Sequence, residues 1–294
     1  MEKAKVYFTK EITPESVVKI YERLGVELPG KVAVKLHSGE KGNQNYLRPE
    51  FVEPMVKKVN GTVVECNTAY EGARNTTQRH EKLMEEHGWS KYFDVDIMDG
   101  KGPDKILEIP EGKVIQKDYV GKNIDNYDSM LVLSHFKGHP MGGYGGAIKQ
   151  LSIGVASGHG KSYIHCIGKE DGTFEDMFQV DQNKFLEAMA DSASAVAKHF
   201  ENKIAYINVM CNMSVDCDCC KVAEDPCIKD IGILASLDPI AIDQACIDLV
   251  YHSEDPGRDH FIERVESKNG IHTIEAAANL GFGTREYELI DIDE

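Results

Sequence analysis

Residues 129–146 read SMLVLSHFKGHPMGGYGG, an apolar run followed by a glycine-rich turn. The run from Ser129 to Ser134 has the composition of a strand that is buried on both faces. The glycines after it permit a tight turn, and the residues from Ala147 to Ile153 predict a short helix. A strand, a glycine loop and a helix start, in this order, are typical of α/β proteins.

Strand and helix patterns alternate on both sides of this stretch. Asp238 and Pro239 are typical of a helix cap and first helical position. We therefore predict a layered α/β fold whose largely parallel or mixed central sheet is flanked by helices. One domain over 1–294 is expected, or two lobes that divide within 90–127. The predicted strands are 6–8, 31–37, 62–66, 129–134 and 204–209, and the predicted helices are 51–59, 77–87, 181–200 and 239–251.

The charge balance limits the classes of partner. Lysine and arginine number 33 against 49 aspartate and glutamate residues, so the formal net charge is −16. This acidity argues against nucleic acid and anionic membranes as partners but leaves room for a local basic pocket. The N-terminus has no apolar signal core, and no stretch of about 18 apolar residues occurs. A cytoplasmic location is expected, where cysteines stay reduced.

The glycine-rich turn has the composition of an anion site. Gly142, Gly143, Gly145 and Gly146 expose backbone N–H groups before a helix start, and Lys149 and Lys161 could neutralise a phosphate or carboxylate. Neither a P-loop nor a Gly-x-Gly-x-x-Gly fingerprint is present. We expect a small anionic ligand here. The alternative is a turn-rich connection that packs closely against a neighbouring strand.

Histidines gather in the same region. His135, His139, His159 and His165 are four of the eleven histidines in the chain. Histidine is a general acid or base near neutral pH and a frequent metal ligand. The density around a glycine loop with two lysines favours a functional site, although one or two of the four should be surface or packing residues.

Five of the eight cysteines lie in one short segment: Cys211, Cys217, Cys219, Cys220 and Cys227. Clustered reduced thiols favour a metal site, either zinc or a four-iron iron–sulphur cluster, over free thiols. Neither usual spacing is present, since the repeated Cys-x-x-Cys motifs of zinc ribbons and ferredoxins do not occur. Asp216 and Asp218 flank the Cys-x-Cys pair and add negative charge that a cation would offset. The other three cysteines are expected in the core, with Cys166 in a strand-like stretch.

Several ordered blocks between about 31 and 250 resemble the iron–sulphur-centre protein family known as domain of unknown function 362. The resemblance implies an iron–sulphur or metal connection through Cys217 and Cys219, and no particular reaction. Many members carry an added ferredoxin-like segment with Cys-x-x-Cys repeats, which these 294 residues do not contain. The matching blocks are VKLHSGEKGNQNYLRPE, ECNTAYEGARNTT, SHFKGHPMGGYGGAIKQLSIG, GHGKSYIHC, VDCDCC and KDIGILASLDPIAIDQA.

A shorter stretch is similar to lactate racemase-like proteins, in which a lysine of a glycine-rich loop carries a nickel-pincer nucleotide. In that family an acid/base histidine lies ten residues before the lysine and a nickel ligand sixteen residues after it. His139, Lys149 and His165 have these spacings. The resemblance implies a pincer-type cofactor on Lys149 as one alternative.

Polar residues also follow two other predicted strands. His37, Lys41, Asn43, Asn45 and Arg48 come after the strand at 31–37, and Asn67, Tyr70 and Arg74 come after the strand at 62–66. The crevice at the carboxyl ends of the strands is the usual ligand site of an α/β sheet. These residues and the 135–149 loop are therefore expected to share one pocket.

Three functional hypotheses follow. The first is a metal- or iron–sulphur-binding protein with a small-anion pocket in 135–165, in which His139, Lys149 and His165 are catalytic and the five clustered cysteines hold the metal. The second is a metal-binding or electron-carrying accessory protein with a redox partner protein. The third is a pincer-cofactor racemase or epimerase. An accessory protein has no need for His139, Lys149 and His165 to converge, which separates it from the two enzymes.

Overall fold

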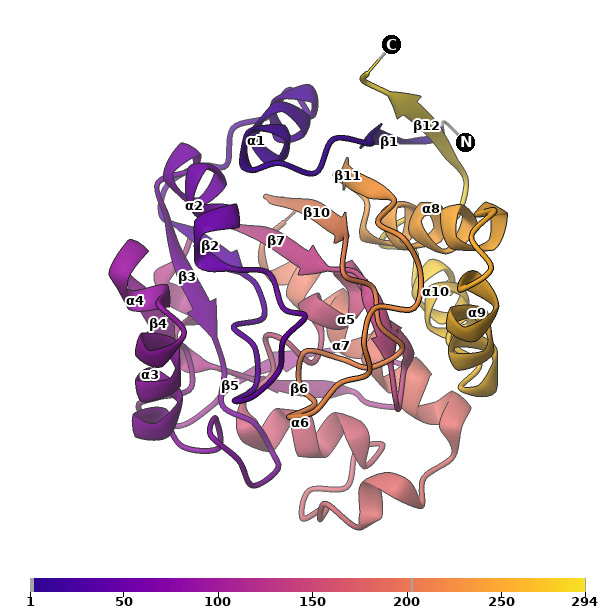
Figure 1. Cartoon of the computed structure of the whole chain (residues 1–294). Helices are drawn as coiled ribbons and strands as arrows, with labels where there is room; N and C mark the ends of the chain where they lie inside the picture. The colour runs from indigo at the N-terminus through magenta and orange to yellow at the C-terminus, as the bar shows by residue number, and fades with distance from the viewer. Residues whose placement is uncertain (1–2, 202, 294) are drawn as a thin grey trace.

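The computed structural model describes residues 3–201 and 203–293, and its centre is an eight-stranded sheet (Figure 1). The strand order is β12-β1-β11-β10-β7-β2-β3-β4. All neighbours are parallel except at β11, which is antiparallel to both β1 and β10. The predicted α/β fold with a mixed, mostly parallel sheet is confirmed. The strands are β1 (Ala4–Thr9), β2 (Val32–Lys35), β3 (Gly61–Glu65), β4 (Val95–Ile97), β7 (Ser129–His135), β10 (Ile204–Met210), β11 (Gly232–Ser236) and β12 (Tyr287–Asp291).

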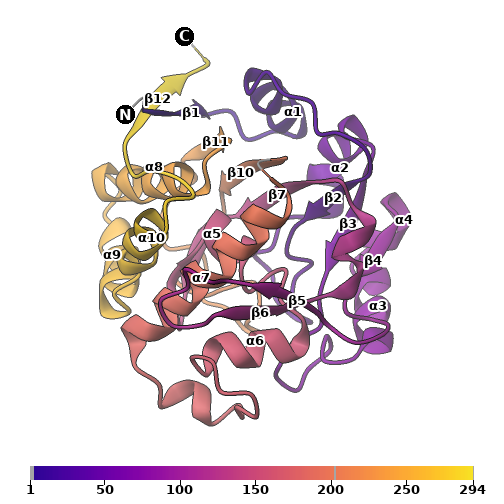
Figure 2. The ribbon, with the colours of Figure 1, turned by 180° about the vertical axis from the view of Figure 1, so that it is seen from behind.

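Helices cover both faces of the sheet and give the molecule three layers (Figures 1 and 2). The first four helices pack on one face, where Val32, Val34 and Leu36 point, and the later helices pack on the other face with Ala33. This alternation matches the strand pattern predicted from the sequence. The helices are α1 (Pro14–Arg23), α2 (Pro49–Lys58), α3 (Thr77–Glu86), α4 (Trp89–Tyr92), α5 (Ala147–Leu151), α6 (Gly158–His165), α7 (Gln182–His199), α8 (Pro239–His252), α9 (Arg258–Ser267) and α10 (Ile271–Asn279).

Shorter elements complete the chain. The segment 90–127 supplies β4 to the sheet and also forms a separate hairpin, which packs near α6 and α7. A second hairpin follows β7 and carries His139 at the end of its first strand. These elements are β5 (Lys105–Glu108), β6 (Lys117–Val120), β8 (Lys137–His139), β9 (Gly143–Gly145) and the 3₁₀ helices η1 (Lys122–Asn126) and η2 (Asp176–Phe178).

Local signals explain most helix boundaries. The Asp238 carboxylate accepts hydrogen bonds from the amides of Ile240 and Ala241, so its predicted capping role is confirmed. Cys166 was expected in a strand-like stretch, and this is wrong because it ends helix α6, which the Ser157 hydroxyl caps at its start. None of the helices that the structure describes is long and apolar enough to cross a membrane.

Candidate functional site

A cavity of about 450 Å³ lies where several strands end. Its lining residues follow the carboxyl ends of β2, β3, β7 and β10, in agreement with the expected crevice. The glycine-rich segment and the cysteine segment therefore share one pocket. Of the residues singled out above as catalytic, anion-binding or metal-binding, the cavity is lined by His139, Lys149, Lys161, His165, Cys217 and Cys219.

His139 presents a protonated ring nitrogen to the cavity. The backbone amides of Met141 and Gly142 donate to its Nδ1 at 3.1 and 2.9 Å. Because Nδ1 accepts two hydrogen bonds, the proton of the neutral ring must lie on Nε2. Burial, reinforced by the nearby Lys149 ammonium, lowers the pKa of His139 to about 4. His139 is therefore a neutral hydrogen-bond donor.

His165 has the opposite tautomer. Its Nδ1 lies 2.7 Å from the carbonyl oxygen of Lys161, which can only accept, so Nδ1 carries the proton and Nε2 keeps its lone pair. Burial lowers the pKa of His165 to about 4, and the ring stacks on Phe185 at a centroid distance of 4.8 Å. A ring held in this way can act as a base or as a metal ligand.

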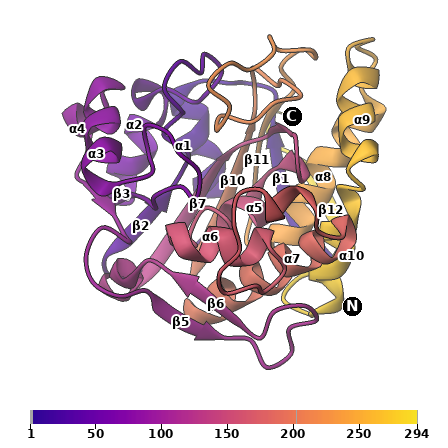
Figure 3. The ribbon, with the colours of Figure 1, turned by 90° about the horizontal axis from the view of Figure 1, so that it is seen from below.

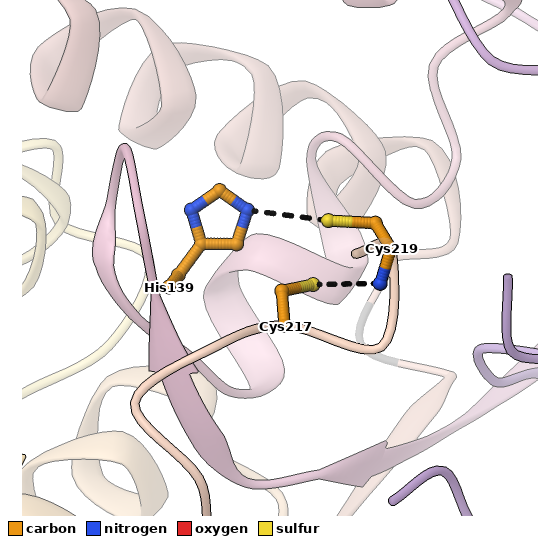
Figure 4. Close-up of side chains that lie close together, drawn as sticks. All are labelled: His139, Cys217 and Cys219. Atoms are coloured by element: carbon orange, nitrogen blue, oxygen red, sulfur yellow. Dashed lines mark hydrogen bonds between the residues drawn. The ribbon is translucent and has the colours of Figure 1, made fainter. Parts of the chain in front are cut away.

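The side chains of Cys217 and Cys219 lie close to that of His139 in the wall of the cavity (Figure 4). One ligand atom from each of the three residues lies within 4.8 Å of the others, and the Cys219 sulfur is 3.9 Å from His139 Nε2. The neighbouring Cys219 and burial raise the pKa of Cys217 to about 12. Cys217 lowers the pKa of Cys219, but Cys220 and burial outweigh it and raise that pKa to about 11. Both thiols are protonated near neutral pH, so a cation that binds them must displace protons.

The carboxylates of the cysteine segment anchor it and do not face the thiols. Asp218 is buried, and its carboxylate lies 2.9 Å from both His135 Nδ1 and Lys137 Nζ. Asp216 pairs with Arg264 at 3.1 Å. The expectation that these carboxylates add negative charge for a cation to offset is wrong, because protein cations already neutralise both.

The loop after β2 holds the same segment from the other side (Figure 3). Asn43 Nδ2 donates to the carbonyl oxygens of Cys217 and Cys220, and Asn45 Nδ2 donates to that of Glu224. Glu40 N donates to the Asp218 carbonyl at 2.8 Å. The asparagines that were expected in the pocket thus position the cysteine segment.

The remaining clustered cysteines lie outside the group of His139, Cys217 and Cys219. Cys211 is buried in the apolar core that contains the first four helices, and its carbonyl oxygen accepts a hydrogen bond from His135 Nε2. Cys227 packs against the carbonyl oxygen of Met213, and Cys220 is half-buried beside Cys219.

The glycines of the turn make room for protein atoms. A side chain on Gly146 would place its Cβ 2.4 Å from Asp243 Oδ1. The buried Asp243 carboxylate accepts hydrogen bonds from Ala147 N and Ile148 N at 2.7 and 3.0 Å. This carboxylate occupies the helix start that the sequence assigned to an external anion, and that assignment is therefore corrected. The cavity lining does not include Gly142, Gly143, Gly145 or Gly146.

Cationic side chains give the cavity its charge. Lys35 pairs with Glu65 at 2.7 Å, and Arg74 pairs with Glu40 at 3.1 Å. Carboxylates of the protein therefore already neutralise these two cationic side chains. Among the described residues, Lys149, Lys161 and Lys268 form no ion pair. Five cationic side chains line the cavity against the single carboxylate of Glu65: Lys35, Arg74, Lys149, Lys161 and Lys268.

The structure also adds Gln150, which sequence reasoning did not single out as a site residue, and it places the expected His37 in the cavity. The Nε2 atom of Gln150 is buried without a hydrogen-bond partner in the wall of the cavity. His37 lines the cavity too, and its Nδ1 accepts from Gly39 N, which leaves an N–H at Nε2. Conversely, His135 binds Asp218, and His159 lies on the surface near Asp104, so neither lines the cavity.

Two solved structures resemble the chain at low identity. One is the lactate racemase apoprotein from Thermoanaerobacterium thermosaccharolyticum, with 15% identity and a TM-score of 0.40, covering 69% of this chain and 50% of the other. The second is a protein from Thermotoga maritima, with 10% identity and a TM-score of 0.41, covering 90% and 58%. This chain thus spans little more than half of their lengths, and neither resemblance carries over a substrate or a cofactor.

No protein of curated function matches the chain. Residues 32–248, well over half of the sequence, match the profile of the family described as "Domain of unknown function (DUF362)". This range contains the cavity residues from Lys35 to Cys219. The chain therefore belongs to the DUF362 family.

Proposed function

We propose that this protein is a metal-dependent enzyme that acts on a small organic anion in the cavity. The observation that carries the proposal is the excess of cationic side chains around the cavity in a chain whose net charge is −16. Lys149 and Lys161 have no carboxylate partner among the described ion pairs, so an anionic ligand would supply one. A volume of about 450 Å³ suits a small molecule.

Cys217 and Cys219 would hold the metal. Two thiolates fit one soft or borderline ion better than a four-iron cluster, which takes about four thiolates. The N–H of His139 Nε2 points to the Cys219 sulfur and would stabilise a thiolate there by a hydrogen bond. A metal ion bound at these thiols would act as a Lewis acid toward an oxygen of the anion.

The two histidines suit proton transfer. His139 offers a hydrogen bond from its Nε2–H group, and His165 offers a lone pair at Nε2 that can accept a proton. Both rings are held in these states by backbone groups, and Lys149 lies in the same cavity. This convergence favours an enzyme over an accessory or electron-carrying protein, which has no need of a hydrogen-bond donor and a base paired beside its metal.

Elemental analysis of anaerobically purified protein tests the metal. We expect about one metal ion per chain, loss of the metal in Cys217→Ser and Cys219→Ser, and retention in the control Cys220→Ser. About four irons per chain would instead support a cluster and contradict the single-ion proposal.

Titration with acetate tests the anion. Lys149→Met should weaken binding, whereas Lys82→Met, on the exposed surface of α3, should not. Equal affinity in the two variants would contradict the assignment of the cavity as the anion site.

A pincer-type cofactor on Lys149 is the second candidate. It is favoured by the place of Lys149 in the same cavity as His139 and His165. Intact-mass analysis would then show a covalent adduct that Lys149→Met loses, and a racemase or epimerase would interconvert the two configurations at the stereocentre of a 2-hydroxy acid.

A further inference from the structure

We infer that the anion bound in this cavity carries a flat apolar group, the size of an aromatic ring, that packs against Phe174 and Phe178. The inference rests on the proposed anion site and names the class of its ligand. That class is a ring-bearing organic anion, as opposed to a purely polar one such as phosphate or acetate.

The exposure of the two phenylalanines is the first observation. Phe174 is 48% exposed and Phe178 is 63% exposed, and both line the cavity. Among the described residues, six large apolar side chains are exposed, and Phe174 and Phe178 are the two aromatic ones in this group. Exposed aromatic surface that lines a concave site, with no protein side chain covering it, is typical of ligand contact.

The aromatic pair is held as a preformed platform. The two rings pack edge to face with centroids 5.1 Å apart. The turn beneath them is fixed by the Asp176 carboxylate, which accepts from Thr173 N at 2.9 Å and pairs with Lys169 at 2.8 Å. Met177, between the rings in sequence, is buried. A ligand ring would therefore meet aromatic surface that is already ordered.

The platform is tied to the helix that carries cavity cations. In α6, Ser162 Oγ donates to the carbonyl oxygen of Gly172 at 2.6 Å, close before the aromatic turn. The same helix places Lys161 and His165 in the cavity. This link fixes the separation between an anion held at Lys161 and a ring held at the platform.

The cavity lining also includes polar side chains that suit the anionic group. Lys149 and Gln150 follow one another in α5, and the Gln150 Nε2 donor is buried without a partner. A carboxylate or phosphate oxygen could accept from Gln150 while the ammonium groups supply the opposite charge. The cavity lining thus combines cationic side chains with exposed aromatic ones, which matches an anion that also carries a ring.

A pair of probes with the same charged group tests the inference. Acetate and phenylacetate differ by one ring, and their affinities for the full-length, metal-loaded protein can be measured by ligand-observed NMR titration. We expect phenylacetate to bind about tenfold more tightly than acetate. The double variant Phe174→Ala, Phe178→Ala should abolish this preference and leave the affinity for acetate unchanged. Leu237→Ala, which removes an exposed side chain elsewhere, should preserve it.

The outcomes separate this inference from the proposed function. Equal affinity for the two probes, or a preference that survives the double variant, would overturn the aromatic platform while leaving the anion site in place. Failure of both probes to bind would overturn both. Since Phe174 and Phe178 are exposed, the double variant should fold, and an unchanged melting temperature checks this.

Discussion

Replacing His165 by glutamine should make the stability of the protein less sensitive to acid. The His165 ring is 9% exposed, and burial lowers its pKa from 6.5 to about 4 in the folded protein. The unfolded chain keeps the ordinary pKa. Between these two values the unfolded state therefore binds a proton that the folded state does not, and acid favours unfolding. A glutamine can still donate to the carbonyl oxygen of Lys161 but does not titrate.

The size of the effect follows from the two pKa values. The full difference is worth roughly 3 kcal/mol, and about 2 kcal/mol of it develops between pH 7 and pH 5. Well above pH 6.5 neither state is protonated at this ring, so the contribution vanishes there. The free energy of unfolding of the wild type should thus fall, relative to His165→Gln, by about 2 kcal/mol over this range. All other titrating groups are common to both proteins and cancel in the comparison.

Urea unfolding of metal-free protein at pH 7, 6 and 5 measures this difference. The m-values of the two proteins should agree, so that the comparison reports stability alone. Stability curves that run parallel from pH 7 to pH 5 would refute the argument, because they would mean that His165 titrates alike in the folded and unfolded states. A direct NMR titration of the His165 ring gives an independent check.

Three further predictions follow from the contacts of the site. Asp218→Ala leaves the buried side chains of Lys137 and His135 without their shared carboxylate, so it should lower the free energy of unfolding by about 3–5 kcal/mol and release bound metal, as urea unfolding and elemental analysis would show. Gly146→Ala places a Cβ 2.4 Å from Asp243 Oδ1 and should destabilise the protein by about 1–3 kcal/mol, whereas Gly158→Ala, whose nearest contact is 3.5 Å, should change stability by less than about 1 kcal/mol. Metal-loaded protein should melt at a higher temperature than stripped protein, and Cys217→Ser should show no such difference; an equal gain in this variant would place the metal elsewhere.

Alternation along the chain predicted the sheet because it depends on local composition. The buried strands β7 and β10 and the capped helices α7 and α8 lie within two residues of their predicted bounds. The C-terminal elements carry weaker signals. Strand β12 lies at the sheet edge with only one neighbour, and its residues are half-buried or exposed, so no buried apolar run marks it.

The site depends on partners that are distant in sequence, and the sequence could not supply them. The glycine turn has the composition of an anion loop, but Asp243, nearly a hundred residues later, provides the carboxylate. Composition likewise cannot show that Asp218 points to Lys137 and away from the thiols. The tautomers of His139 and His165 are set by backbone groups at three- and four-residue spacing, which only the folded turns bring into contact.

Buried ion pairs explain how a chain with a negative net charge can have a positively charged cavity. The buried carboxylates of Glu65 and Asp218 are already bound to side chains of the protein: Glu65 to Lys35, and Asp218 to Lys137 and His135. These pairs are buried, so water and salt screen them little. The ammonium groups of Lys149 and Lys161 therefore keep their attraction for an outside anion, even though the net charge of the protein is −16. The buried ion pairs thus set the charge of the cavity, and breaking any of them would free a carboxylate to compete with the ligand.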